Sequence, residues 1–282
     1  MKKITRRSFM AAAGLTVAAL ALTACGGSSS TASSAAASSV ASSAAASSEA
    51  ASAAATELTT VEAGKLTMAT NAAFPPYEMT TDAGEFEGID IETAQAIADK
   101  LGLELQIDDM DFDAALLSVQ QGKADIVMAG VTVTDERKAV MDFSDSYATG
   151  IQSIIVPEGS DIASPDDLAG KKIGTQRGTT GYIYCSDDFG DENVVAYDNG
   201  LTAVQALGNG QVDAVVIDNA PAKEFVAANP GLVILDTSYA EEDYAIGMAK
   251  GSSLEDAVNA ALEELKADGT LQSIVDKYIT AE

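Results

Sequence analysis

The sequence predicts an α/β protein with two lobes that face each other across a cleft. From about residue 58 to the end, short β-type runs alternate with helical patterns, which favours parallel strands joined by helices. One part of this pattern occurs twice, at 116–130 and 204–218, which predicts two equivalent α/β units. The chain has 282 residues and 47% apolar content, enough for a sizeable core.

The first 25 residues have the pattern of a signal peptide. A basic start is followed by an apolar stretch, Ala11 to Leu22, which is too short for a stable membrane span. The closing "LTAC" resembles the bacterial lipoprotein box, so we expect cleavage before Cys25 and a lipid on that cysteine. Arg6 and Arg7 also suit a twin-arginine export signal, and the choice between this route and the general secretory route stays open.

Residues 26–57 are almost entirely Ser and Ala and are predicted to be a tether. Such a segment has too little apolar surface to offset the entropy of ordering, although its Ala content also permits transient helix. As a flexible coil of this length it would span about 30 Å. We therefore expect the folded part to begin near residue 58.

Composition excludes several classes of function. The formal net charge of −27 opposes binding to nucleic acid or to anionic lipid headgroups. The sequence contains no histidine, which excludes histidine-based triads and the usual zinc sites, and we expect neither a metal nor a cofactor. Beyond Cys25 there is one cysteine, Cys185, which is expected to be a small packed side chain.

The first predicted elements form a strand, helix, strand unit. Residues 65–70 and 103–107 have strand patterns, and apolar residues recur at helical spacing from Ile91 to Leu101 between them. Gly102 is placed to end that helix. This order predicts a parallel pair of strands.

The two similar stretches, 116–130 and 204–218, align without gaps as helix, glycine, aspartate and buried strand. The alternative is a general helix–glycine–strand arrangement that recurs across α/β folds. If the units are equivalent, Gly130 and Asp218 end corresponding strands, and ligands of open α/β sheets bind outside those ends. The two residues would then face one cleft from opposite sides.

Candidate anion-binding groups follow the first of these strands. Thr132 and Thr134 supply hydroxyls, and Arg137 supplies a planar cation suited to a carboxylate. The alternative for Arg137 is a surface residue paired with neighbouring acids. The loop 178–181 offers backbone N–H groups to the same anion, or is a simple turn.

Asp218 is a candidate partner for an ammonium group, or a helix cap before Pro221. A carboxylate site facing an ammonium site describes an α-amino acid as ligand. Phe74, Tyr77 and Phe112 lie near predicted strand ends and can supply aromatic walls.

Ordered motifs from 58 to 282 identify a family. They are "ATNAAFPPYE" (69–78), "GEFEGIDIE" (84–92), "MDFDAALLSVQQGKADIVMAGVTVTDERK" (110–138), "MDFSDSY" (141–147), "IGTQRGTTG" (173–181) and "DAVVID" (213–218). In this order they resemble the polar amino-acid-binding family of extracytoplasmic solute-binding proteins, which serve ABC importers. The resemblance implies the periplasmic-binding-protein fold, in which each lobe is a sheet flanked by helices and a two-strand hinge joins the lobes.

The resemblance also implies roles for individual residues. Two aromatic rings sandwich the ligand side chain, one group of residues holds the α-carboxylate, and one carboxylate takes the α-ammonium. By position, the rings are those of Phe74 and Phe112, the carboxylate group is Gly130, Thr132, Arg137, Thr179 and Thr180, and the ammonium partner is Asp218.

The ligand side chain is less closely specified. In the family, the positions that match Asn71 and Gln176 vary with the ligand, and both are neutral here. Glu78 would add negative charge, but the resemblance suggests that it faces away. These positions favour a neutral polar amino acid such as glutamine.

The predicted protein is a lipid-anchored, extracytoplasmic, monomeric binding protein that delivers a polar L-amino acid to an ABC transporter permease. It is not expected to be an enzyme or to bind nucleic acid. Two alternatives stay open: a cyclohexadienyl dehydratase on the same fold, with Glu78 as general acid, and a sensor subunit. The predicted lobes are 58–150 with 243–282, and 151–242.

Overall fold

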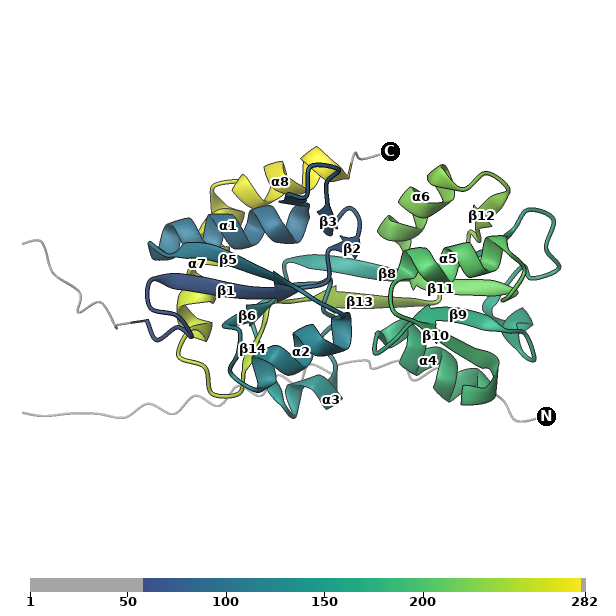
Figure 1. Cartoon of the computed structure of the whole chain (residues 1–282), viewed down its shortest axis with the longest axis horizontal. Coiled ribbons are helices and arrows are strands. Elements are labelled where there is room, and N and C mark those ends of the chain that lie inside the picture. The colour runs from purple at the N-terminus through teal and green to yellow at the C-terminus, as the bar shows by residue number, and fades with distance from the viewer. Residues whose placement is uncertain (1–57, 280–282) are drawn as a thin grey trace, which may run out of the picture. The chain divides into compact units, whose positions relative to one another are not determined.

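The computed structural model describes residues 58–279. The predicted signal peptide, Cys25 and the tether lie outside the described residues. Two β-sheets with helices on their faces make up most of the described chain, and a small third sheet lies beside the first (Figure 1). Within the described residues, no helix combines the length and the apolar character needed to cross a membrane.

The first sheet has the strand order β5-β1-β6-β14-β7. Strands β1, β5 and β6 are parallel, as their sequence pattern predicts, whereas β14 runs antiparallel to both β6 and β7. The strands are β1 (Lys65–Thr70), β5 (Glu104–Asp109), β6 (Ile126–Val127), β7 (Met141–Phe143) and β14 (Gly247–Ala249).

The second sheet has the order β10-β9-β11-β8-β12, with β13 also paired to β8. Its parallel part is again three strands, β10, β9 and β11, and β8 is antiparallel to β11, β12 and β13. The strands are β8 (Ala148–Pro157), β9 (Ile173–Gln176), β10 (Val194–Tyr197), β11 (Ala214–Asp218), β12 (Leu232–Ile234) and β13 (Ala240–Tyr244).

Helices cover both faces of each sheet, because successive strand residues point in opposite directions. In β1, Met68 packs with the cluster that includes α1 and α7, and Ala69 packs with the cluster that includes α2. The helices are α1 (Ile89–Leu101), α2 (Phe112–Gln120), α3 (Asp135–Lys138), α4 (Thr180–Phe189), α5 (Gly200–Gly208), α6 (Asn219–Ala228), α7 (Glu255–Ala267) and α8 (Thr270–Tyr278), with 3₁₀ turns η1 (Pro165–Leu168) and η2 (Asp191–Asn193).

The same division holds in the second sheet. Helix α4 covers one face, where Cys185 packs against Ile173 in a fully buried position, and α5 and α6 cover the other face. Cys185 is thus a packed core side chain, and burial raises the pKa of its thiol to about 12.

The repeated sequence stretch corresponds to a repeated structure. In each copy a helix ends before a glycine with positive φ, at 65° in Gly122 and 68° in Gly210. The aspartate that follows accepts a hydrogen bond from the backbone N–H of an adjacent segment. Asp125 accepts from Thr67 at 2.8 Å, and Asp213 accepts from Lys172 at 2.7 Å. The strand that comes next is parallel to its neighbour in both copies: β6 is parallel to β1, and β11 is parallel to β9. The two stretches are therefore equivalent units.

The chain passes between the two sheets twice, from β7 to β8 and from β13 to β14. Strands β8 and β13 pair from Ala148 opposite Tyr244 to Gln152 opposite Ala240. The predicted lobe boundaries, 150/151 and 242/243, lie a few residues from these crossings. The difference arises because β8 and β13 stay paired in the second sheet as far as Ala148 and Tyr244. The strands that enter after a crossing, β8 and β14, are the antiparallel neighbours of β11 and β6.

A small antiparallel sheet, β2-β3-β4, lies next to the first sheet. Its strands are β2 (Ala73–Phe74), β3 (Glu78–Thr80) and β4 (Phe86–Glu87).

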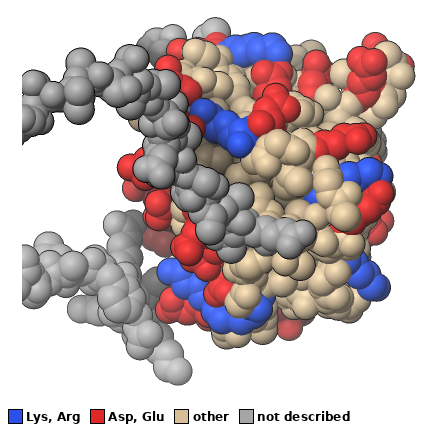
Figure 2. Space-filling view, turned by 90° about the vertical axis from the view of Figure 1, so that its left-hand side faces the viewer, with Lys and Arg blue, Asp and Glu red and all other residues tan. Residues whose placement is uncertain are grey.

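Acidic side chains are spread over the end of the molecule shown in Figure 2, with the basic ones dispersed among them.

Candidate functional site

The parallel strands of both sheets end at one cavity. Asn71 follows β1, Phe112 follows β5 and Gly130 follows β6, while Gln176 and Asp218 are the last residues of β9 and β11. The carboxyl ends of parallel strands are the usual place for ligands in open α/β sheets. The side chains at these strand ends enclose about 440 Å³ of space that no protein atom fills, part of it open to solvent.

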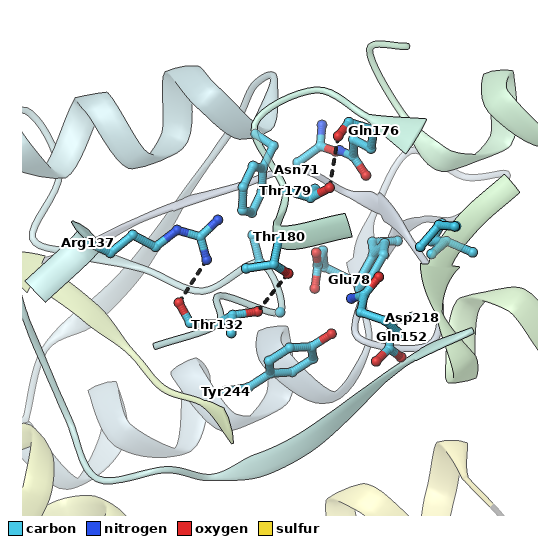
Figure 3. A pocket seen from close by; sticks show the side chains of 16 residues that line it. Asn71, Glu78, Thr132, Arg137, Gln152, Gln176, Thr179, Thr180, Asp218 and Tyr244 are labelled. Atoms are coloured by element: carbon cyan, nitrogen blue, oxygen red, sulfur yellow. Dashed lines mark hydrogen bonds between the residues drawn. The ribbon is translucent and has the colours of Figure 1, made fainter. Parts of the chain in front are cut away.

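All ten ligand-binding residues predicted from the sequence line this cavity (Figure 3). They are Asn71, Phe74, Phe112, Gly130, Thr132, Arg137, Gln176, Thr179, Thr180 and Asp218. Six further residues complete the lining: Glu78, Ala129, Gln152, Val216, Ile217 and Tyr244.

Arg137 is a buried cation at the cavity wall, not a surface residue. It lies on the short helix α3, whose N-cap Thr134 accepts a hydrogen bond from the Arg137 N–H at 3.2 Å. The guanidinium donates to the carbonyl of Thr132 at 2.7 Å and to that of Gly178 at 3.1 Å, and lies 5.4 Å from the Phe112 ring centroid. A guanidinium has five N–H donors, so it can also bind a ligand carboxylate.

The charge of Arg137 is balanced by a residue that the sequence did not indicate. Glu242, on β13, is 6% exposed and accepts hydrogen bonds from Thr132 Oγ1 at 3.1 Å and Gln152 Nε2 at 3.0 Å. Burial lowers the pKa of Arg137, and the charge of Glu242 opposes that shift. The anion site therefore has its own buried counter-charge.

Asp218 is both the N-cap of α6 and part of the cavity wall, so its role as a helix cap does not exclude a role at the ligand site. Its Oδ1 accepts from the N–H of Ala220 at 3.0 Å as the N-cap of α6, and its Oδ2 accepts from Ile151 at 2.7 Å. The residue is 2% exposed. Burial raises its pKa to about 6 although these hydrogen bonds lower it, so the carboxylate gains from a cation placed in the cavity.

The segment 178–181 joins β9 to α4 at the cavity. Gly178 has φ of 74°, and Thr179 is the N-cap of α4, accepting from the Tyr182 N–H at 3.3 Å. The helix begins at Thr180, so the predicted loop is shorter than expected. Thr180 shares a hydrogen bond of 3.4 Å with Thr132 of the first lobe. The helix N-terminus can attract an anion at this point.

Neutral groups surround the other end of the cavity. Gln176 Nε2 donates to Asn71 Oδ1 at 2.9 Å, and Asn71 Nδ2 donates to the Met110 carbonyl at 2.9 Å. The rings of Phe74 and Phe112 also line the cavity, and both side chains are buried.

Gly130 is required by its surroundings. Its φ is +55°, and a Cβ added there would lie 3.0 Å from the Phe74 ring and 3.2 Å from the Tyr244 ring. Its N–H donates to Asp90 Oδ2 at 3.0 Å. Glycine allows both the left-handed backbone and the close approach of two rings.

None of the six further lining residues was predicted to bind the ligand, and three of them have polar groups. The expectation that Glu78 faces away is wrong: it is 1% exposed and lines the cavity, because β3 turns it inward. Gln152 and Tyr244 lie on the paired strands β8 and β13, where no single motif marks them.

Among residues 58–279, no three His, Cys, Asp or Glu side chains group as a possible metal site.

Comparisons with known proteins decide the family. The profile of the bacterial extracellular solute-binding proteins, family 3, matches residues 66–281. This chain belongs to that family. The predicted family and the predicted two-lobed α/β fold are both confirmed.

Individual members of the family show similarity over most of the chain. The L-cystine-binding protein TcyJ of Escherichia coli K12 is 33% identical over 226 residues, covering 78% of this chain and 85% of TcyJ. The Probable histidine-binding protein of Neisseria gonorrhoeae is 32% identical over 279 residues, covering 96% of this chain and 95% of that protein. An ancestral arginine-binding protein, solved bound to arginine, is 43% identical with a TM-score of 0.73, covering 77% of this chain and 98% of that chain. Capture of a solute, rather than catalysis, is the activity that these names describe.

Proposed function

We infer that this family member captures a polar L-amino acid in the cavity between its two sheets and delivers it to an ABC importer. The observation that carries this is that one cavity wall contains both a buried cation, Arg137, and a separate buried carboxylate, Asp218. A zwitterion is costly to bury unless both of its charges are matched. Relatives that bind cystine, histidine, arginine and glutamine support the class of ligand.

In the proposed complex, the ligand carboxylate binds the Arg137 guanidinium and the N-terminus of α4, aided by Thr132 and Thr180. The ligand ammonium binds Asp218, and its side chain lies between the rings of Phe74 and Phe112. The groups come from both sheets, so the ligand would complete contacts only when both lobes approach it. Capture then favours the closed arrangement, because the ligand binds it more strongly than an open one.

We propose that the two crossings between the sheets form the hinge, dividing the chain into lobes near the predicted boundaries. We also propose that the protein is a monomer held at the outer face of the cell membrane by a lipid on Cys25, with 26–57 as tether. Labelling with a radioactive fatty acid tests the anchor, since a Cys25→Ser variant should lose the label.

A thermal-shift screen of the purified soluble part against the amino acids tests the function. A ligand at 100 times its Kd raises the free energy of unfolding by about 2.7 kcal/mol, and isothermal calorimetry then gives the affinity. If no amino acid shifts the melting temperature or gives a binding heat, the proposed function is wrong. Incubation with prephenate or arogenate tests the alternative of a dehydratase, and we expect no product.

A further inference from the structure

Glu78 is a buried carboxyl group at the cavity wall that no other group satisfies. It begins β3, is 1% exposed, and lies among the labelled side chains of Figure 3 between Thr180 and Asp218. Within residues 58–279, neither of its oxygens receives a hydrogen bond from an N–H or O–H group. A buried carboxylate without donors is strongly disfavoured, so its protonation state needs an explanation.

The neighbouring Asp90 explains the state of Glu78. The charge of Asp90 acts on Glu78, and two neighbouring buried carboxyl groups cannot both be ionised without a large cost. Asp90 already accepts hydrogen bonds from Tyr147 Oη at 2.7 Å and from the Gly130 N–H at 3.0 Å, which favour its ionised form. Glu78 has no such donors, so the proton belongs on Glu78.

The shifts in pKa agree with this assignment. Burial and then the charge of Asp90 raise the pKa of Glu78 well above its usual value. Burial raises the pKa of Asp90 to about 6, and its hydrogen bonds with Gly130 and Tyr147 oppose that rise.

The charges around Glu78 are mainly negative. Asp90 on α1, Asp109 on β5 and Asp218 on β11 each raise its pKa, and the phenol of Tyr77 adjoins it. The cavity wall contains one basic residue, Arg137, which interacts with the buried Glu242 and, in the proposed complex, also with the ligand carboxylate. Asp218 balances the ligand ammonium, so Glu78 is left as a surplus acid. A ligand whose side chain is also positively charged would match it.

We propose that Glu78 holds a proton in the free protein and loses it to the solvent when an amino acid with a cationic side chain is captured. The O–H bond of Glu78 breaks, the proton passes to the buffer, and the carboxylate pairs with the ligand cation. A neutral ligand such as glutamine leaves the proton in place. This rests on the proposed function, and it favours a cationic amino acid such as arginine over the neutral one that Asn71 and Gln176 favour.

Calorimetry in two buffers of different ionisation enthalpy, phosphate and Tris, measures the protons released on binding. At about pH 8 both Asp90 and Asp218, with pKa values of about 6, are ionised and contribute little. We expect arginine to release about one proton and glutamine, if it binds, to release almost none. The arginine affinity should also rise with pH.

Variants separate Glu78 from general effects. Glu78→Gln keeps the size of the side chain but cannot ionise, so it should abolish the proton release and weaken arginine binding at least about tenfold, with glutamine binding changed little. The control is Glu87→Gln, the same change at an exposed site on the adjacent β4, which should alter neither quantity.

Three results would overturn the proposal. Arginine binding with no net proton release, or proton release that survives in Glu78→Gln, contradicts it while leaving the proposed function intact. Binding of glutamine without binding of any cationic amino acid does the same. Failure of every amino acid to bind would instead overturn the proposed function, and this inference with it.

Discussion

Replacing Asp218 by Asn should separate ligand binding from folding. The change keeps the size of the side chain and one acceptor oxygen but removes the negative charge. In the free protein, Asp218 accepts backbone hydrogen bonds from Ile151 and Ala220. In the proposed complex it also balances the ligand ammonium, which Asn cannot do.

Two opposing effects on stability can be worked from these contacts. Raising the pKa of Asp218 from 3.8 to about 6 corresponds to about 3 kcal/mol of destabilisation when the carboxylate is ionised. Because the folded pKa is the higher one, this cost is absent below about pH 4, grows between about pH 4 and pH 6, and is fully present above about pH 6. Asn removes the cost, but one of the two backbone N–H groups loses its acceptor, at about 1–3 kcal/mol. The free energy of unfolding at neutral pH should therefore change by no more than about 2 kcal/mol.

For ligand binding, Asp218→Asn has no second effect that offsets the lost charge. Removing one partner of a buried, hydrogen-bonded charge pair costs about 2–5 kcal/mol, which weakens the affinity by about 30-fold to several thousandfold. Calorimetry with the preferred amino acid measures this, and urea denaturation of the free protein measures stability. An affinity within threefold of the unsubstituted protein would refute the assignment of the ammonium to Asp218. A loss of more than about 4 kcal/mol in stability would refute the balance of effects described above.

Three further predictions use the same assays. Arg137→Lys should weaken binding at least about tenfold, because an ammonium cannot bridge Thr132, Gly178 and a ligand carboxylate in the plane of a guanidinium; unchanged calorimetric affinity would contradict this. Gly130→Ala should reduce stability by about 1–2 kcal/mol in urea denaturation and weaken binding, because its φ is +55° and its Cβ would meet two rings; full affinity would show that the rings can move. Affinity for a neutral amino acid should fall about tenfold per pH unit below about pH 6, where Asp218 gains a proton, and a flat profile from pH 7.5 to 5 would contradict the pairing.

The parts of the fold and site that sequence could predict are those coded locally. The helix, glycine, aspartate and strand pattern occurs within fifteen residues in each copy, so its equivalence could be seen before the structure. That equivalence placed Gly130 and Asp218 at corresponding strand ends, and both line the cavity. The aromatic residues and the loop 178–181 were already candidates from their places along the chain, and the family motifs gave a role to Phe74, Phe112, Thr179 and Thr180.

The parts that could not be predicted depend on pairing between distant segments. Gln152, Glu242 and Tyr244 reach the site only because β8 pairs with β13, about ninety residues away, and neither strand has a distinctive motif. The antiparallel direction of strands such as β8 and β13 was not predicted for the same reason, since it follows from the chain crossing between sheets. Glu78 was misplaced because the direction of a three-residue strand depends on its neighbours, not on its own pattern.

Tyr244 connects the cavity wall to the crossing between the sheets. It ends β13, its backbone carbonyl accepts from the Tyr147 N–H at 3.0 Å, and its ring lines the cavity. On the paired strand, a Cβ added to Gly150 would lie 2.5 Å from this ring. A change at Gly150, which does not line the cavity, would therefore displace a wall of the site. Selection for a new ligand can consequently act through the connecting strands, so the residues that set affinity need not be those that touch the solute.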